Sequence, residues 1–208
     1  GLLGGWNVAT AGRLSVGGKS PLTGGVKEAN SGGTAGDVLG KLGLRAVVIE
    51  NQPPAGGWFL LHIQADSASL IPADEVRGLG TYATSDRLQE RFGPDSTVIS
   101  IGQAGEWLMG GAGICVTGEG GQRSNHAARG GLGAVMGSKG LKAVVIDKPV
   151  SRTDPFADEA LFRTAARAFA QKLINDPKLG RSGSQHLYGT ASIVGAVNEI
   201  GSLPTRNF

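Results

Sequence analysis

The stretch "MGSKGLKAVVID" at residues 136–147 repeats a pattern that the chain also carries at residues 39–50, "LGKLGLRAVVIE". Both copies read Gly-x-x-Gly-Leu, a basic residue, Ala-Val-Val-Ile and an acidic residue. A β-branched run entered through glycine is typical of a buried strand, so we expect strands at 44–50 and 141–147. Two copies are too few for a solenoid, which needs about three. The repeat therefore predicts two similar units that pair about a pseudo-two-fold axis.

Other elements can be placed around the repeat. The runs "WFLLHIQ" at 58–64 and "STVISIG" at 96–102 predict two further strands. The segment "TSDRLQERFG" at 84–93 predicts a short helix with Thr84 or Ser85 as its N-cap and a glycine at its end. Beyond the second copy, residues 157–176 show apolar residues at helical spacing, and residues 189–201 predict another helix.

The predicted fold class is α+β. A body over residues 1–150 contains the two pseudo-symmetric sheet-and-helix repeats, at about 1–60 and 95–150, and residues 151–208 begin a helical second domain. The chain opens without Met and stops soon after a predicted helix. We therefore expect a piece of a larger protein.

The composition is that of an ordinary globular protein, with 40% hydrophobic and 18% charged residues among 208. No apolar run of about 18 residues predicts a membrane span, and no secretory leader pattern is present, so we expect a cytoplasmic protein. A net charge of +3 without a long Lys/Arg run does not favour a nucleic-acid partner. Cys115, the single cysteine, cannot form an internal disulfide and is expected to be a small buried residue.

Glycine is the compositional anomaly, with 36 residues where a usual share of about 7% would give far fewer. Each copy of the repeat has a glycine-rich turn beside polar or basic residues, Asn30 and Ser31 in the first and Arg129 in the second. Backbone N–H groups in such turns and a nearby arginine suit phosphate, and Arg13 is a second arginine of this kind. Neither turn matches a P-loop or a Rossmann fingerprint. The sequence predicts two anion sites for a ligand with two phosphate arms, unless the glycines serve only to turn the chain.

Five segments together resemble the tungsten-containing aldehyde ferredoxin oxidoreductases, in order and over almost the whole chain. They are "KSPLTG" (19–24), "ANSGG" (29–33), "SIGQAGEWL" (100–108), "RGGLGAVMGSKGLKAVVI" (129–146) and "LYGTASIVGAVNEIGSLPTRNF" (187–208). The resemblance implies a bis-pterin cofactor, in which two molybdopterin-type dithiolenes hold one tungsten or molybdenum and magnesium bridges their phosphates. It also implies that further strands and later domains of such a protein lie outside these residues.

The resemblance implies a set of cofactor contacts in this chain. Arg13 would contact phosphate, and Gly32 would lie beside the pterin. The backbone carbonyls of Asn30 and His126 would reach the magnesium. The complete set of implied cofactor-binding residues is Arg13, Ala29, Asn30, Gly32, Asn125, His126, Ala128 and Arg129.

The chain departs from the family pattern at Asn125 and His126, where most members have Arg-Ala. Two alternatives follow, because either Arg123 supplies the lost charge or the Asn-His pair lines the site differently. A backbone carbonyl is offered by any residue, so the departure bears on phosphate binding more than on magnesium binding. It also leaves the choice between tungsten and molybdenum open.

The activity implied by the resemblance is the oxidation of an aldehyde to a carboxylic acid, with electrons leaving through an iron–sulfur cluster to ferredoxin or another electron-transfer subunit. The cluster cysteines and the acid/base residues of the family belong to later domains, so no catalytic residue is assigned here. A related enzyme with another substrate, such as an aryl-CoA reductase subunit, and a non-catalytic pterin-binding module are the alternatives. A homodimer is left open.

Several other residues have competing interpretations. Glu106 could contact a pterin amine, although a capping or solvated carboxylate is the preferred interpretation. His62 lies in an apolar strand and is expected to be a structural histidine. Arg45 and Lys142 match across the repeat, which favours a shared structural role at the entry to a strand.

Overall fold

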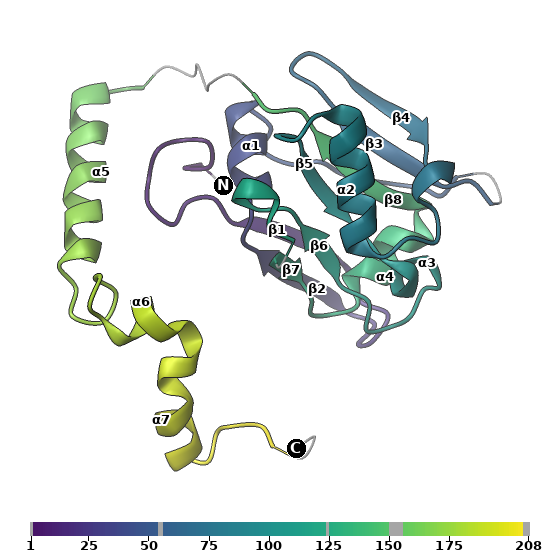
Figure 1. Cartoon of the computed structure of the whole chain (residues 1–208). Coiled ribbons are helices and arrows are strands. Elements are labelled where there is room, and N and C mark those ends of the chain that lie inside the picture. The colour runs from purple at the N-terminus through teal and green to yellow at the C-terminus, as the bar shows by residue number, and fades with distance from the viewer. Residues whose placement is uncertain (1, 54–55, 124, 150–155, 206–208) are drawn as a thin grey trace. The chain divides into compact units, whose positions relative to one another are not determined.

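The computed structural model describes residues 2–53, 56–123, 125–149 and 156–205. The chain divides into two compact units, Gly1–Asp154 and Pro155–Phe208. The first unit contains the strands and the second is helical (Figure 1).

The first unit is organised around a six-stranded sheet in the order β4-β3-β8-β5-β6-β7. Its central strand β8 runs parallel to β3 and antiparallel to β5, and the remaining pairs are antiparallel. All six residues of β8 are buried because the strand has neighbours on both edges and packing on both faces. The strands are β3 Phe59–Ile63, β4 Ala68–Pro72, β5 Thr97–Ser100, β6 Ile114–Val116, β7 Asn125–Ala127 and β8 Leu141–Ile146.

A separate antiparallel hairpin consists of β1, Leu14–Lys19, and β2, Val26–Ser31. Its connection is tightened by Ser20, whose buried hydroxyl accepts hydrogen bonds from the N–H groups of Leu22 and Thr23. The hairpin contacts β7 through β2 and α4 through β1. It is therefore held against the larger sheet although it does not join it.

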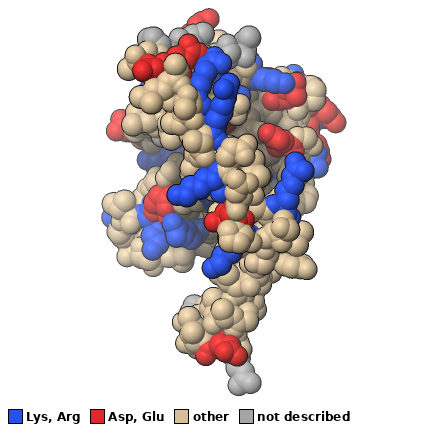
Figure 2. Space-filling model, turned by 90° about the vertical axis from the view of Figure 1, so that its left-hand side faces the viewer, with Lys and Arg blue, Asp and Glu red and all other residues tan. Residues whose placement is uncertain are grey.

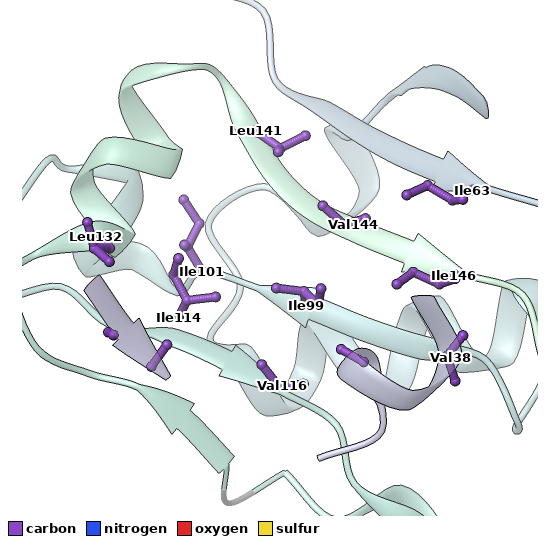
Figure 3. Packing of buried hydrophobic residues seen from close by; sticks show 13 residues of the cluster. Val38, Ile63, Ile99, Ile101, Ile114, Val116, Leu132, Leu141, Val144 and Ile146 are labelled. Atoms are coloured by element: carbon purple, nitrogen blue, oxygen red, sulfur yellow. The ribbon is translucent and has the colours of Figure 1, made fainter. Parts of the chain in front are cut away.

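Side chains on the two faces of the large sheet build two hydrophobic clusters. One includes Val144 and Ile146 of β8, Ile99 of β5 and Val38 of α1 (Figure 3). The other includes Val145 of β8 and residues of α2 on the opposite face. The helical elements of this unit are α1 Ala35–Lys41, η1 Asp74–Val76, α2 Thr81–Phe92, α3 Gln103–Glu106, η2 Glu119–Gly121 and α4 Leu132–Ser138.

The second unit confirms the predicted change to helix. Its first helix begins after Asp158, whose side chain accepts a hydrogen bond of 2.8 Å from the Leu161 N–H. This is the N-terminal capping that a helix with unpaired first N–H groups favours. The elements are α5 Glu159–Ile174, α6 Ser184–Tyr188, η3 Gly189–Ile193 and α7 Val194–Glu199. In the described parts of the chain, no helix is both long and apolar enough to cross a membrane.

The strand predicted at 44–50 is wrong. These residues are irregular and exposed, and Val48 keeps 78% of its surface accessible. Its counterpart Val145 is fully buried in β8. The physical reason is pairing: β8 lies between β3 and β5, whereas the ladders of the described residues include no pairing for 44–50.

The repeat holds only in part. In both copies a seven-residue helix, α1 or α4, ends two residues before a glycine in the left-handed conformation. These glycines are Gly43, with a φ of 73°, and Gly140, with a φ of 63°. The sheet units that should surround them differ, so the pseudo-symmetric arrangement stays a prediction. Arg45 and Lys142 also differ, because Arg45 is exposed outside any strand and Lys142 is buried within β8.

The N-cap predicted for the helix at 84–93 is also wrong. Helix α2 begins at Thr81, after Gly80 in an extended conformation. Thr84 and Ser85 are fully buried inside the helix, on a face that it shares with Leu88. Thr84 and Ser85 therefore serve in packing against the sheet and do not cap the helix. The strands predicted at 58–64 and 96–102 are confirmed as β3 and β5.

Candidate functional site

The outward face of β2 carries the polar residues of the candidate site. Along this strand Ala29 and Ser31 point inward and are buried, whereas Glu28 and Asn30 alternate with them and are accessible. Alternation of this kind follows from the two-residue period of a strand. Asn30 lies opposite Ser15 on β1 in the hairpin register. The hairpin thus presents a polar face over a buried one.

Two arginines reach this face from distant parts of the sequence. Arg13, just before β1, donates from Nε to the Asn30 Oδ1 at 2.9 Å. Arg129, after β7, donates from Nε to the Glu28 carbonyl at 2.9 Å and from Nη2 to the Glu28 carboxylate at 2.8 Å. Because Glu28 and Asn30 are two residues apart on one face, both guanidinium groups meet the same side of β2.

The Glu28 carboxylate also accepts a hydrogen bond from Ser15 of β1. The Ser15 hydroxyl donates to its Oε1 at 2.9 Å. Hydrogen bonds from Arg129 first, and then from Ser15, lower the pKa of the Glu28 carboxyl below its usual value. The carboxylate is thus charged at neutral pH. Figure 2 shows one face of the molecule, on which basic and acidic side chains are interspersed.

The first glycine turn is packed against the end of the large sheet. A Cβ on Gly33, whose φ is +91°, would lie 2.6 Å from the Thr117 carbonyl oxygen. The neighbouring Thr34 N–H donates to this oxygen at 3.0 Å. A Cβ on Gly32 would lie 2.9 Å from Asn125 Oδ1, so the Asn125 amide sits directly against the turn.

The second glycine turn is shaped by packing as well. Gly131 has a φ of 69°, and a Cβ there would overlap the carbonyl oxygen of Gly110. The close approaches at Gly33 and Gly131 are thus made to atoms of the chain itself. Packing against the chain itself therefore accounts for both glycines.

A polar cavity of about 810 Å³ opens beside the first turn. Its lining includes Gly33, Thr34 and Asn125 together with the side chains of Trp6, Asp37 and Glu119. A cavity of this size is within the range that binds small molecules and cofactors. In the described residues, no group of three or more His, Cys, Asp or Glu side chains could hold a metal ion.

The structure brings together most, but not all, of the predicted site residues. Arg13, Asn30 and Arg129 share one face, and Asn125 lies at Gly32. Ala29 is buried beneath this face, and Ala128 is exposed. His126 is exposed on β7, opposite Cys115 in the register. Arg123 pairs with Asp86 on α2, so of the two alternatives the geometry favours Asn125 lining the turn.

Glu106 of α3 and Lys142 of β8 form a buried pair. Lys142 Nζ pairs with Glu106 and donates to the Leu79 carbonyl at 2.7 Å, while the Glu106 carboxylate accepts from the Gly78 N–H at 3.0 and 2.9 Å. Burial lowers the pKa of Lys142, and Glu106 partly opposes this shift. The preferred interpretation of Glu106 as a capping or solvated carboxylate is wrong, because its side chain is buried against Lys142 and the Gly78 N–H that it accepts from does not begin a helix. The pair itself was missed because its partners lie far apart in sequence.

His62 and Cys115 are structural, as the sequence predicted. His62 Nε2 lies 2.7 Å from the Asp147 Oδ1, and its ring packs on Phe92 with centroids 4.5 Å apart. Cys115 is buried in β6 and its Sγ lies 3.3 Å from the Arg123 carbonyl. Burial raises the pKa of the Cys115 thiol, which keeps it protonated and unreactive at neutral pH.

Comparison with known proteins gives consistent matches. Residues 1–148 match the family described as aldehyde ferredoxin oxidoreductase, N-terminal domain. The tungsten-containing aldehyde ferredoxin oxidoreductases of Pyrococcus furiosus and Pyrococcus abyssi are 38% and 40% identical over 209 residues, covering all of this chain and 33% of theirs. The chain therefore spans about a third of the length of these curated relatives.

A solved structure is also similar. The active-site complex BamBC of benzoyl coenzyme A reductase, in complex with 1,5-dienoyl-CoA, matches with a TM-score of 0.75 and 27% identity. The match covers 83% of this chain and 25% of that one. The mixed arrangement of sheet and helices is therefore shared with a known enzyme.

Proposed function

The chain belongs to the aldehyde ferredoxin oxidoreductase family, and on that premise we propose that it grips the phosphate arms of a bis-molybdopterin cofactor carrying tungsten or molybdenum. The observation that carries the proposal is the convergence of Arg13 and Arg129 on one face of β2. Charged N–H donors of this kind form strong, directional contacts with phosphate.

The residues of the chain fit the phosphate end of such a cofactor in charge and in chemistry. Arg13 and Arg129 would donate to phosphate oxygens, and Asn125 would line the turn at Gly32. The backbone carbonyls of Asn30 and His126 would be available to magnesium, which prefers oxygen ligands. The remaining contacts would come from Gly32 and Ala128, whereas Ala29 is buried beneath the face and would support it from below.

The role of the chain is binding and orientation. The metal–dithiolene group supplies the two-electron redox chemistry when it is bound, and the protein positions and tunes it. Arg13 and Arg129 would fix the phosphate arms by charge, while the packed glycine turns hold the backbone rigid around them. No side chain of the described residues is assigned a proton-transfer step.

For the whole protein, we propose oxidation of aldehydes to carboxylic acids, with electrons passing through an iron–sulfur cluster to ferredoxin in the cytoplasm. The names of the relatives support this substrate class and electron partner, and they favour tungsten. The cluster and the substrate pocket would belong to the remaining domains.

A second candidate is a reductase acting on an aryl-CoA, which the similarity to the benzoyl coenzyme A reductase complex favours. The two are separated by assaying the full-length protein with an aldehyde and an oxidised viologen, and with an aryl-CoA thioester and a strong reductant. A protein that holds pterin but turns over neither substrate would support the non-catalytic module instead.

The experiment that tests cofactor binding uses the full-length protein from cells supplied with both tungstate and molybdate. Metal content and pterin fluorescence are measured for the wild type and for the Arg13→Ala and Arg129→Ala variants. Each variant should lose cofactor because a charged contact to phosphate worth about 1.5–3 kcal/mol is removed. Unchanged metal and pterin in both variants would refute the proposed contacts.

A further inference from the structure

Glu28 places a negative charge on the face of β2 that Arg13 and Arg129 contact. Its carboxylate accepts from Arg129 Nη2 at 2.8 Å and from the Ser15 hydroxyl at 2.9 Å, on the same face of β2 as Asn30. The side chains of Arg129 and Glu28 remain 65% and 43% exposed. Solvent and an incoming anion therefore both have access to this pair.

The two arginines are held in different ways. Arg13 donates to the neutral amide oxygen of Asn30, whereas Arg129 donates to the charged carboxylate of Glu28. Arg129 has a second anchor, because its Nε donates to the backbone carbonyl of Glu28 at 2.9 Å. That anchor does not depend on the Glu28 side chain, so Arg129 can keep its place if the carboxylate moves away or is replaced.

The charges of Arg13, Arg129 and Glu28 determine how this face would interact with a phosphate. Arg13 and Arg129 together carry two positive charges, and Glu28 cancels one of them. A phosphate monoester carries about −1.5 to −2 at neutral pH and takes the same guanidinium N–H donors as a carboxylate does. A phosphate at Arg129 would therefore meet both a competitor for hydrogen bonds and a like charge.

We infer that Glu28 is a built-in competitor of the phosphate group at Arg129, and that it sets how tightly this face holds a phosphate-bearing cofactor. The inference rests on the proposed function. It makes Glu28 a residue that tunes affinity and release through Arg129, in addition to keeping the guanidinium on the face of β2.

The test compares release of the cofactor from the full-length protein and its variants. Pterin fluorescence and metal content are followed during dialysis at low and at high ionic strength. Glu28→Gln keeps the size of the side chain and removes its charge, and should slow release by about threefold at low salt, in line with exposed ion pairs. The gain should shrink at high salt because the charges are screened.

Two further variants tie the effect to its proposed cause. In an Arg129→Lys background, which keeps the charge but loses the forked contact, Glu28→Gln should slow release by less than it does in the wild type. Glu75→Gln, which removes a carboxylate that pairs with Arg91 outside the site, is the matched control. It alters the net charge by the same amount and should leave the release rate unchanged.

The outcomes separate this inference from the proposal beneath it. If the wild-type protein contains no pterin, the proposed function fails and Glu28 has no phosphate to compete with. If the wild type contains pterin but Glu28→Gln releases it at the same rate or faster, only the competition is refuted. An equal gain in the Arg129→Lys background, or in the Glu75→Gln control, would also refute it.

Discussion

Replacing Glu106 with glutamine tests how much the buried ion pair contributes to the stability of the first unit. The side chains of Lys142 and Glu106 are 0% and 7% exposed. Removing one charge leaves the other buried without a counter-charge, which usually costs 3–5 kcal/mol. Glutamine keeps an amide oxygen that can accept from Gly78 and from Lys142 Nζ. We therefore expect a loss near the lower limit, about 3 kcal/mol.

The double variant Glu106→Leu/Lys142→Met provides the matched comparison. Removing both charges avoids an unpaired buried ion, and such replacements are often neutral or stabilising. The exposed Gly78 N–H can turn to water. We expect the double variant to be more stable than Glu106→Gln by about 2 kcal/mol or more, measured as the free energy of unfolding in urea by circular dichroism. A Glu106→Gln variant within 1 kcal/mol of the wild type would refute the reasoning.

The same pair predicts a pH dependence. Burial lowers the pKa of Lys142 in the folded state, whereas an unfolded lysine titrates near its ordinary value of about 10.4. Between the two values the unfolded state binds more protons, so the contribution of Lys142 to stability rises with pH. The wild type should therefore gain more stability, or lose less, than Lys142→Met as the pH approaches 10. Equal slopes for both proteins would contradict this.

Two further predictions use matched positions. Val145→Ala should lower the free energy of unfolding of the 208-residue chain by about 2 kcal/mol, because it leaves a cavity at a buried site. Val48→Ala, at the exposed counterpart, should change this free energy by less than about 0.5 kcal/mol. Equal losses of stability in urea denaturation would contradict the difference. Gly78→Ala should lower the free energy of unfolding by about 1–2 kcal/mol because of its positive φ alone. Gly131→Ala should lower it further, because the new Cβ also overlaps the Gly110 carbonyl. A higher thermal unfolding temperature for Gly131→Ala than for Gly78→Ala would refute this.

Local patterns were sufficient for much of the fold and for the family. The strands β3, β5 and β8, the helix α5 and the change to helix in the second unit all follow from the periodicity of apolar residues. Family membership followed from five ordered motifs, among them the long run at 129–146. Arginines beside glycine turns were sufficient to nominate Arg13 and Arg129.

The remaining features depend on contacts between distant residues. No pattern in the sequence singles out Glu28, and only the tertiary structure brings Arg129 and Ser15 to its carboxylate. Lys142 looked equivalent to Arg45, and only burial against Glu106 distinguishes them. An ion pair between residues far apart in the sequence has no characteristic spacing, so it cannot be predicted from local patterns.

The sequence by itself determined that two apolar runs, 44–50 and 141–147, favour extended backbone, and that a glycine precedes each. Tertiary structure alone decided that one of them becomes the buried centre of a sheet while the other stays exposed. The physical reason is that a strand is stabilised by hydrogen bonds and side-chain contacts with its neighbours. β8 has β3 and β5 on its two edges, and an identical Ala-Val-Val-Ile run without such neighbours gains neither.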